Sequence, residues 1–261
     1  GALLLGPRIG RFGTDGRAHP IPGHNMPYAV LGTIILWFGW FGFNPGSTLG
    51  VVSGDRVGFF AYVALTTNLA AAAGALGGIV TAWLVLKRPD ISMMLNGVLA
   101  ALVAVTAASG FVAPWAALVI GGVAGSMAVG GVIAVERLRI DDPIGAVAVH
   151  GLAGVWGTLA TGIFAAPTLA ATLATGTGGL LYTGSFHQLG IQALGLVVVG
   201  AFTFSASFAS LWALKALWGI RAEPETETAG LDVAEHGASG YPEFYPRLYE
   251  FERLERLERA A

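Results

Sequence analysis

Four long stretches of the sequence contain no Asp, Glu, Lys or Arg, and this pattern constrains the fold more than any other feature. They run over residues 18–54, 57–86, 91–135 and 143–214. A helix needs only about 20 apolar residues to cross a hydrocarbon core of roughly 30 Å. The stretches therefore predict membrane-spanning segments. Only 11% of residues are charged, against about 25% in a soluble domain, which excludes a typical water-soluble enzyme.

Two of these stretches are too long for one crossing, and turn signals divide them. Residues 109–115 interrupt the third stretch, and the Gly-, Thr- and Ser-rich residues 166–188 interrupt the fourth. The many small residues favour close helix packing in lipid, and the sequence lacks the alternation expected of barrel strands. We therefore predict an all-α, polytopic membrane helix bundle. Its six helices are expected near residues 26–46, 57–86, 91–109, 114–136, 143–165 and 189–216.

Loop charges predict the orientation of the bundle. Loops rich in Lys and Arg remain on the cytoplasmic side of a membrane. This rule places both chain ends in the cytoplasm of a multi-pass protein of the cell membrane, plasma or inner. Residues 1–25 are interpreted as the end of a preceding helix followed by a cytosolic loop, and residues 217–261 as a cytosolic tail. The charges that support this orientation are Arg8, Arg11, Arg17, Lys87, Arg88, Arg137, Arg139, Lys215 and Arg221.

The tail combines two patterns. Residues 222–227 are acidic and resemble a disordered segment. Leu248, Phe251, Leu254 and Leu257 recur every three residues among Glu and Arg, which predicts a short amphipathic helix. This helix could lie on its own protein or dock on a neighbouring subunit or regulator.

Composition excludes several classes of function. The chain has no cysteine, so it has no disulfide framework, thiolate nucleophile or zinc–cysteine site. A net charge of −2 without a Lys/Arg cluster among aromatics gives no basis for nucleic-acid binding. We expect no enzyme activity, no cofactor and no metal.

His150 is the most informative polar residue inside a predicted span. An ionisable side chain at this depth is a functional candidate by default. The alternative is a neutral histidine hydrogen-bonded between helices, with nearby Gly151, Gly154 and Gly157 serving only packing. Both interpretations stay open on the residues alone.

Two further motifs flank the predicted spans. Asp142 before Pro143 is typical of an N-cap followed by a favoured first helical position. The aromatic run from Trp37 to Ser47 ends the first span. It is either an interfacial anchor or a vestibule whose ring faces attract a cation.

These residues resemble a known family. The run from Gly32 to Ser47 closely resembles the signature of the ammonium transporter and Rh-protein family, as does Asp141-Asp142-Pro143 followed by the segment from Val149 to Gly154. The segment from Gly230 to Gly237 resembles the cytosolic tail of that family. The motifs occur in the family's order, and the resemblance extends from residue 1 to about residue 241.

The resemblance implies an eleven-helix fold of two inverted repeats, in which this chain supplies the second half, helices six to eleven. It also implies a homotrimer with one pore per subunit. The family's first pore histidine, one gate phenylalanine and one tryptophan of the outer site belong to the other half. The chain is therefore expected to be a fragment with half a pore.

The resemblance assigns roles to individual residues. Trp40, Phe43 and Ser47 resemble the outer cation site and its gate, and His150 resembles the second of the paired pore histidines. The residues expected to line the pore are Leu36, Asn96, Thr106 and Ala146.

The implied function is transport of ammonium, ammonia or methylammonium for nitrogen uptake. The alternatives are an ammonium sensor, whose tail reports to partners such as a PII-type regulatory protein, and a membrane subunit that conducts nothing.

Overall fold

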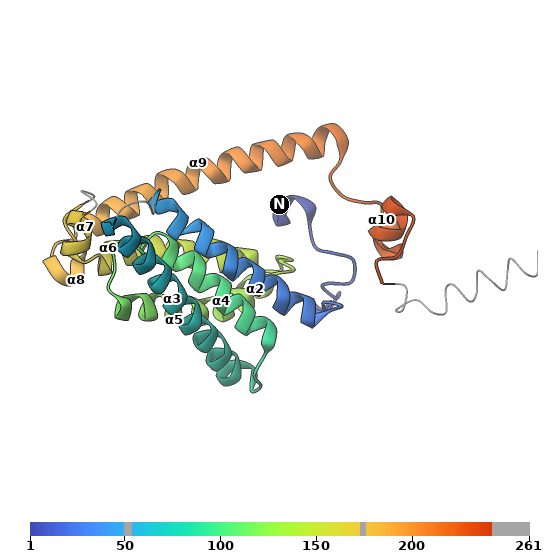
Figure 1. The fold of residues 1–261 in the computed structure, drawn as a ribbon. Coiled ribbons are helices and arrows are strands. Elements are labelled where there is room, and N and C mark those ends of the chain that lie inside the picture. Colours follow the sequence, from blue (N-terminus) through green and yellow to red (C-terminus); the bar gives the residue numbers. More distant parts are fainter. Residues whose placement is uncertain (50–53, 173–175, 242–261) are drawn as a thin grey trace, which may run out of the picture.

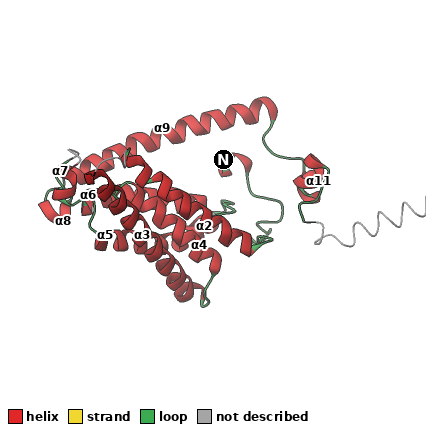
Figure 2. Cartoon of the chain, viewed as in Figure 1, coloured by secondary structure: helices red, strands yellow, loops and turns green. Residues whose placement is uncertain are grey.

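The computed structural model describes residues 1–49, 54–172 and 176–241, and no strand is assigned among them (Figure 2). The predicted all-α fold is confirmed. The helices are α1 (Ala2–Leu5), α2 (Met26–Phe43), the 3-10 turn η1 (Pro45–Thr48), α3 (Gly54–Leu86), α4 (Ile91–Thr106), α5 (Pro114–Arg137), the π turn η2 (Val147–Leu152), α6 (Ala153–Phe164), α7 (Pro167–Thr172), α8 (Leu180–Thr183), α9 (His187–Trp218), α10 (Pro224–Ala229) and α11 (Leu231–His236).

Five of the described helical segments are long and apolar enough to cross a membrane, when η2 and α6 are taken together. The sixth, α4, has only 16 residues. A helix of that length spans about 24 Å. Since α4 contacts α2, α3, α5 and α6, much of its surface is covered by other helices rather than offered to lipid.

Several helix boundaries differ from the prediction, and three of the differences bear on the predicted motifs. The helix expected over residues 26–46 ends at Phe43, because Pro45 cannot continue the α-helical hydrogen bonds and begins η1 instead. The helix expected to end at residue 109 ends at Thr106. The helix expected from residue 143 begins at Val147, so Pro143 lies in a turn before the helix and not in its first turn.

The core is formed by α3, α4 and α5, which approach closely through small residues. A methyl group placed on Gly121 of α5 would lie 2.1 Å from the carbonyl oxygen of Ala70 on α3. At Gly125 it would lie 2.2 Å from the carbonyl oxygen of Gly74. Larger side chains at these positions would push the helices apart, so glycine at the contact allows the helices to pack.

The remaining helices surround this core unevenly. In Figure 1, α2 lies along α4, and α9 runs across the bundle and extends beyond it toward α10. Along its 32 residues, α9 has no buried residue. An apolar helix with such an exposed surface is stable only in lipid or against another apolar partner.

Two segments predicted to lack regular structure contain short helices. Residues 166–188 include α7 and α8, and the acidic residues 222–227 overlap α10. Pro224 occupies the start of α10, and the first turn carries acidic side chains, both of which favour a helix N-terminus. The amphipathic helix predicted within residues 242–261 lies outside the described residues.

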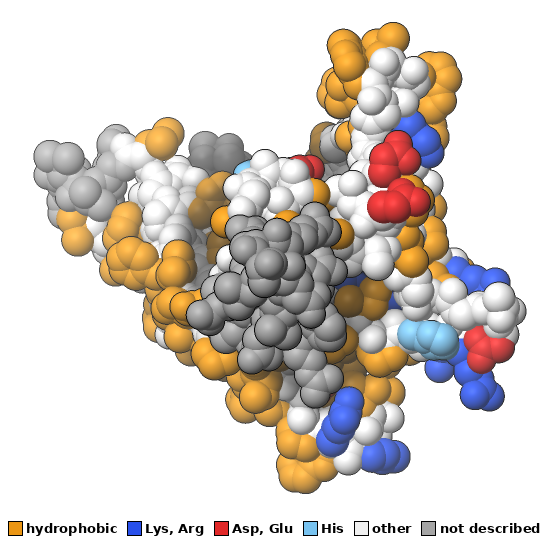
Figure 3. Space-filling view, turned by 90° about the vertical axis from the view of Figure 1, so that its right-hand side faces the viewer, with side chains coloured by type: hydrophobic (Ala, Val, Ile, Leu, Met, Phe, Trp, Pro, Cys, Tyr) orange, Lys and Arg blue, Asp and Glu red, His pale blue; other side chains and the backbone are white. Residues whose placement is uncertain are grey.

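Charged side chains concentrate where α3 and α5 end. We name this the charged end, defined by Arg8, Arg11, Glu136, Asp141 and Glu227. Figure 3 looks onto this part of the molecule, where Lys, Arg, Asp and Glu side chains are visible beside hydrophobic flanks. The apolar body of the bundle therefore carries a cluster of charges at this end.

Candidate functional site

The aromatic residues near the end of α2 contact the end of α4. Trp40 Nε1 donates a hydrogen bond to Thr106 Oγ1 at 2.9 Å, and the Trp40 ring packs edge-on against Phe43, with 5.9 Å between centroids. Thr106 Oγ1 donates its own proton to the Leu102 carbonyl at 2.7 Å, which leaves a lone pair for the indole. Three residues predicted for the site, Trp40, Phe43 and Thr106, thus form one cluster.

The turn η1 brings Ser47 close to this cluster. Ser47 Oγ donates a hydrogen bond to the Phe43 carbonyl at 2.6 Å. The turn is attached to α3 by Asn44, a buried residue whose Nδ2 donates to Thr67 Oγ1 at 3.2 Å. Ser47 and Phe43 are both exposed. A hydroxyl and an aromatic ring are therefore presented together at the surface.

Trp37, one turn before Trp40, begins the aromatic run, but no individual role was predicted for it. Its ring packs against the buried cluster of Ala71, Val98 and Leu102. Its Nε1 is buried and has no hydrogen-bond partner among the described residues. A buried donor without an acceptor costs about 1–3 kcal/mol. An acceptor from an additional packed segment would therefore stabilise this position.

His150 lies on η2, in the only π turn that the described residues contain. Ala148 and Val149 are buried in the core, whereas the His150 side chain is exposed. Leu36 on α2 is 50% exposed. Both η2 and α2 pack against α4. His150 and Leu36, which is predicted to line the pore, therefore lie on two segments that contact the same helix. π turns inside α-helices occur frequently at functional sites.

The chain before η2 is held by Asp142. Its Oδ1 accepts a hydrogen bond from the Ala146 N–H at 2.9 Å and its Oδ2 from the Val147 N–H at 2.7 Å. Gly145 lies between Asp142 and these two amides and has a φ of +73°. A methyl group on Gly145 would lie 3.0 Å from Asn96 Nδ2. Asn96 and Ala146, both expected to line the pore, are half-buried beside this connection.

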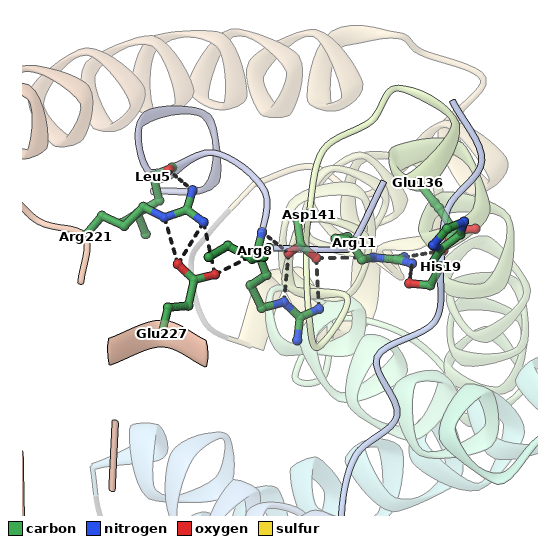
Figure 4. A network of polar contacts seen from close by, with 9 residues as sticks. Leu5, Arg8, Arg11, His19, Glu136, Asp141, Arg221 and Glu227 are labelled. Atoms are coloured by element: carbon green, nitrogen blue, oxygen red, sulfur yellow. Dashed lines mark hydrogen bonds and ion pairs between the residues drawn. The ribbon is translucent and has the colours of Figure 1, made fainter. Parts of the chain in front are cut away.

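The charged end contains an ion-pair network that the sequence did not predict (Figure 4). Asp141 has a side chain only 3% exposed. Its carboxylate accepts hydrogen bonds from Arg8 Nε at 2.8 Å, Arg8 Nη2 at 3.0 Å and the Arg8 backbone N–H at 2.9 Å. Arg11 Nε lies 3.4 Å from the same carboxylate, and its Nη2 pairs with Glu136. This network joins the N-terminal loop to the end of α5.

The tail contributes to the same network. Glu227 on α10 accepts a hydrogen bond from the Ile9 N–H at 2.8 Å and pairs with Arg221 at 2.8 Å. Arg221 Nη1 also donates to the Leu5 carbonyl at 3.1 Å. The N-terminal loop therefore lies between the tail and the connection to η2.

The pKa values of the Asp141 and Glu227 carboxylates are both lowered, which favours their ionised form. Hydrogen bonds from Arg8 hold the pKa of Asp141 below its usual value, although burial acts in the opposite direction. The Ile9 N–H and then Arg221 lower the pKa of Glu227. Both groups are therefore charged at neutral pH.

Sequence reasoning treated Arg8 and Arg11 only as orientation signals, and Asp141 only as part of the Asp141-Asp142-Pro143 motif, with its capping role and its resemblance to the family signature. The separation of 133 residues between Arg8 and Asp141 hides their contact from any local pattern. Within the described residues, no group of three or more His, Asp and Glu side chains could hold a metal ion.

Comparison with known proteins places these features in context. The model of the Ammonium Transporter Family matches residues 1–241. The ammonium transporter Amt2 of Archaeoglobus fulgidus is 47% identical over 244 residues, which cover 93% of this chain and 51% of that protein. The ammonium transporter Amt1 of Haloferax mediterranei is 40% identical over 252 residues, 94% of this chain and 46% of that protein.

Solved structures agree with the sequence matches. A protein described as a sensor Amt protein superposes with a TM-score of 0.79 and 40% identity, covering 90% of this chain and 55% of its own. Candida albicans Mep2 superposes with a TM-score of 0.75 and 32% identity, covering 85% and 48%. The chain spans about half the length of the relatives it matches.

Proposed function

This chain belongs to the ammonium transporter family, and from that premise we propose that it forms one wall of a membrane pathway for ammonium or ammonia. One observation carries the proposal: four side chains that the resemblance assigns to the pathway are exposed, namely Leu36, Phe43, Ser47 and His150. They lie on α2, on the adjoining turn η1 and on η2, and both α2 and η2 pack against α4. An exposed imidazole in an apolar setting is costly unless a partner or a pathway covers it.

We propose that a second half of similar size completes the pathway, as the length of the relatives suggests. It would cover the exposed faces of α2 and η2 and offer acceptors to groups such as Trp37 Nε1. Three copies of the completed protein would form a homotrimer in the cell membrane. The positive loops at the charged end support a cytoplasmic position for that end and for the C-terminus.

The mechanism follows from the differences between ammonium and potassium. The two cations have the same charge and similar size, but ammonium donates hydrogen bonds and can lose a proton. The Trp40 and Phe43 rings and the Ser47 hydroxyl would collect the cation at the outer end. A dry, apolar path would then disfavour its charged form. A neutral His150 imidazole can accept or relay hydrogen bonds along that path.

A test of this function uses the completed protein in liposomes, with His150→Ala compared with wild type under ammonium and then potassium gradients. The matched control is His19→Ala, an exposed histidine of the N-terminal loop. We expect His150→Ala to fold, because it leaves no buried charge, and to lose discrimination between ammonium and potassium. Wild-type rate and selectivity in His150→Ala would refute the role of His150.

A second candidate function, ammonium sensing, is favoured by the superposition on a sensor Amt protein and by the contact of the tail with the bundle through Glu227. In a sensor, substrate occupancy would change the tail, and a PII-type regulatory protein is the kind of partner that would read it. Removing residues 222–261 would abolish signalling but leave methylammonium flux intact in a sensor. Signalling that survives removal of the tail would refute the proposal that the tail reports occupancy.

A further inference from the structure

The carboxylate of Asp141 is buried, and its hydrogen-bond donors come from a loop more than a hundred residues away in the sequence. Arg8 supplies three of its hydrogen bonds, two from the guanidinium and one from the backbone. Arg11 contacts the same carboxylate only at 3.4 Å, so without Arg8 the buried charge keeps one weaker ion pair and must take up a proton or move toward water or toward Arg11. The position of residue 141 therefore depends on Arg8.

The next residue holds the start of the His150 turn. Asp142 binds the N–H groups of Ala146 and Val147, so any displacement of residues 141 and 142 is transmitted to those two amides. Val147 and His150 belong to the same six-residue turn. A shift of the first amides of η2 thus moves the imidazole directly.

The other side of this connection allows little compensation. At Gly145, a methyl group would lie 2.9 Å from Val132 Cγ2 and 3.0 Å from Asn96 Nδ2. The backbone is therefore packed against α4 and α5 on one side and fixed by the Asp141 network on the other. Such a connection moves as a unit when one of its two supports is lost.

We propose that Arg8 is a positioning residue, which acts through Asp141 and Asp142 to fix where the π turn begins and so where the His150 imidazole lies. The proposal rests on the proposed function for its consequence in transport, but the positioning itself can be measured separately. Arg8 touches neither the imidazole nor the aromatic cluster in the contacts described above.

The experiment compares Arg8→Met, Arg8→Lys and wild type in the completed protein. The matched control is Arg17→Met, because Arg17 belongs to the same loop but forms an exposed ion pair with Asp15. Hydrogen exchange of the peptide that contains Ala146 and Val147 reports positioning. The ratio of ammonium to potassium flux in liposomes reports the consequence.

In Arg8→Met we expect these two amides to exchange at least about tenfold faster, because the hydrogen bonds from Arg8 to Asp141 are lost and a hydrogen bond to a charged group is worth about one to two decades in an equilibrium constant. Exchange at the centre of α5 should be unchanged. The flux ratio should fall several-fold, Arg8→Lys should be intermediate, and Arg17→Met should match wild type. If Arg8→Met does not accumulate, Arg8→Met with Asp141→Asn removes the buried charge as well and should show the same losses.

The outcomes separate the two proposals. Wild-type exchange and flux ratio in the Arg8 variants would overturn the positioning role. The same holds if His150→Ala changes the flux ratio but the Arg8 variants do not. Faster exchange without any effect of His150→Ala on selectivity would support positioning by Arg8 and refute the function assigned to His150.

Discussion

α5 and α9 are both long, apolar helices, but they differ completely in burial. In an apolar stretch of 18 residues, 44% of the α5 residues are buried, whereas none of the α9 residues is. The difference lies in where the small residues fall. Gly121 and Gly125 of α5 lie against the α3 backbone, whereas Gly195 and Gly200 of α9 have open space beside them. An apolar surface therefore lets a helix enter the membrane, whereas small residues at the contact positions determine which helix it packs against.

The largest effect is expected at a glycine of the α3–α5 contact. In Gly125→Ala, the new methyl group would lie 2.2 Å from the Gly74 carbonyl oxygen, so the two helices must separate. We expect a loss of about 1–3 kcal/mol or more in the free energy of unfolding. The amount of folded protein in membranes and its thermal midpoint in detergent measure this loss.

The control is on the same helix. Gly130→Ala meets nothing within 4 Å, so it should be neutral or slightly stabilising, since alanine favours a helix over glycine. Gly195→Leu on α9 should also be tolerated. If Gly195→Leu is as harmful as Gly125→Ala, then α9 is packed against a partner in the completed protein, and its exposure reflects only this chain.

Some of this architecture could be predicted from the sequence, for identifiable reasons. Charge-free stretches and hydropathy identified the apolar helices, because a membrane imposes a minimum length of uncharged residues. The start of η2 at Val147 was missed, because it depends on side-chain contacts of Asp142 and on packing at Gly145. The Asp141–Arg8 pair was missed because contacts between distant residues leave no local period. For Trp40 and His150 the residues alone left a functional and a structural interpretation open, and only the resemblance favours specific roles, which stay predictions.

An intermediate effect is expected at Trp40, which lies between the packed and exposed regions. Its indole N–H binds Thr106 on α4, while Phe43 beside it is 56% exposed. If its ring face holds a cation, Trp40→Leu should weaken apparent ammonium affinity about two- to thirtyfold, as a contribution of about 0.5–2 kcal/mol implies. Concentration-dependent flux in liposomes measures this change.

Trp83→Leu is the matched control, because Trp83 is an exposed tryptophan of α3 outside this cluster. It should keep wild-type affinity. Unchanged affinity in Trp40→Leu, together with loss of protein from the membrane, would show instead that Trp40 is an interfacial anchor and belongs with the packing residues.

The smallest effect is expected when mild acid acts on the charged end. Unlike α5 and α9, this part of the molecule is held together by ion pairs. The pKa of Asp141 is lowered in the folded protein by Arg8, so its contribution to stability is fully present above the unfolded value of about 3.9. It is lost only as pH falls through the folded value. The difference in thermal midpoint between wild type and Asp141→Asn should therefore stay constant from about pH 8 to pH 5 and shrink below about pH 4.

Asp15→Asn, which alters only an exposed pair with Arg17, should show little difference from wild type at any of these pH values. A difference for Asp141→Asn that already disappears near pH 6 would contradict the lowered pKa.

The π turn at His150 has a consequence for how such chains diverge. An i→i+5 turn holds one residue more than an α-helical turn. A relative that lacks this residue would show a gap at a single alignment position within residues 147–152. Because the π turn accommodates the extra residue, one codon gained or lost there changes which direction the residues inside the turn face, whereas an insertion that no bulge absorbed would rotate all following residues by about 100°. A single small indel can thus relocate an imidazole around a helix while the packed glycines of α3 and α5 remain unaltered.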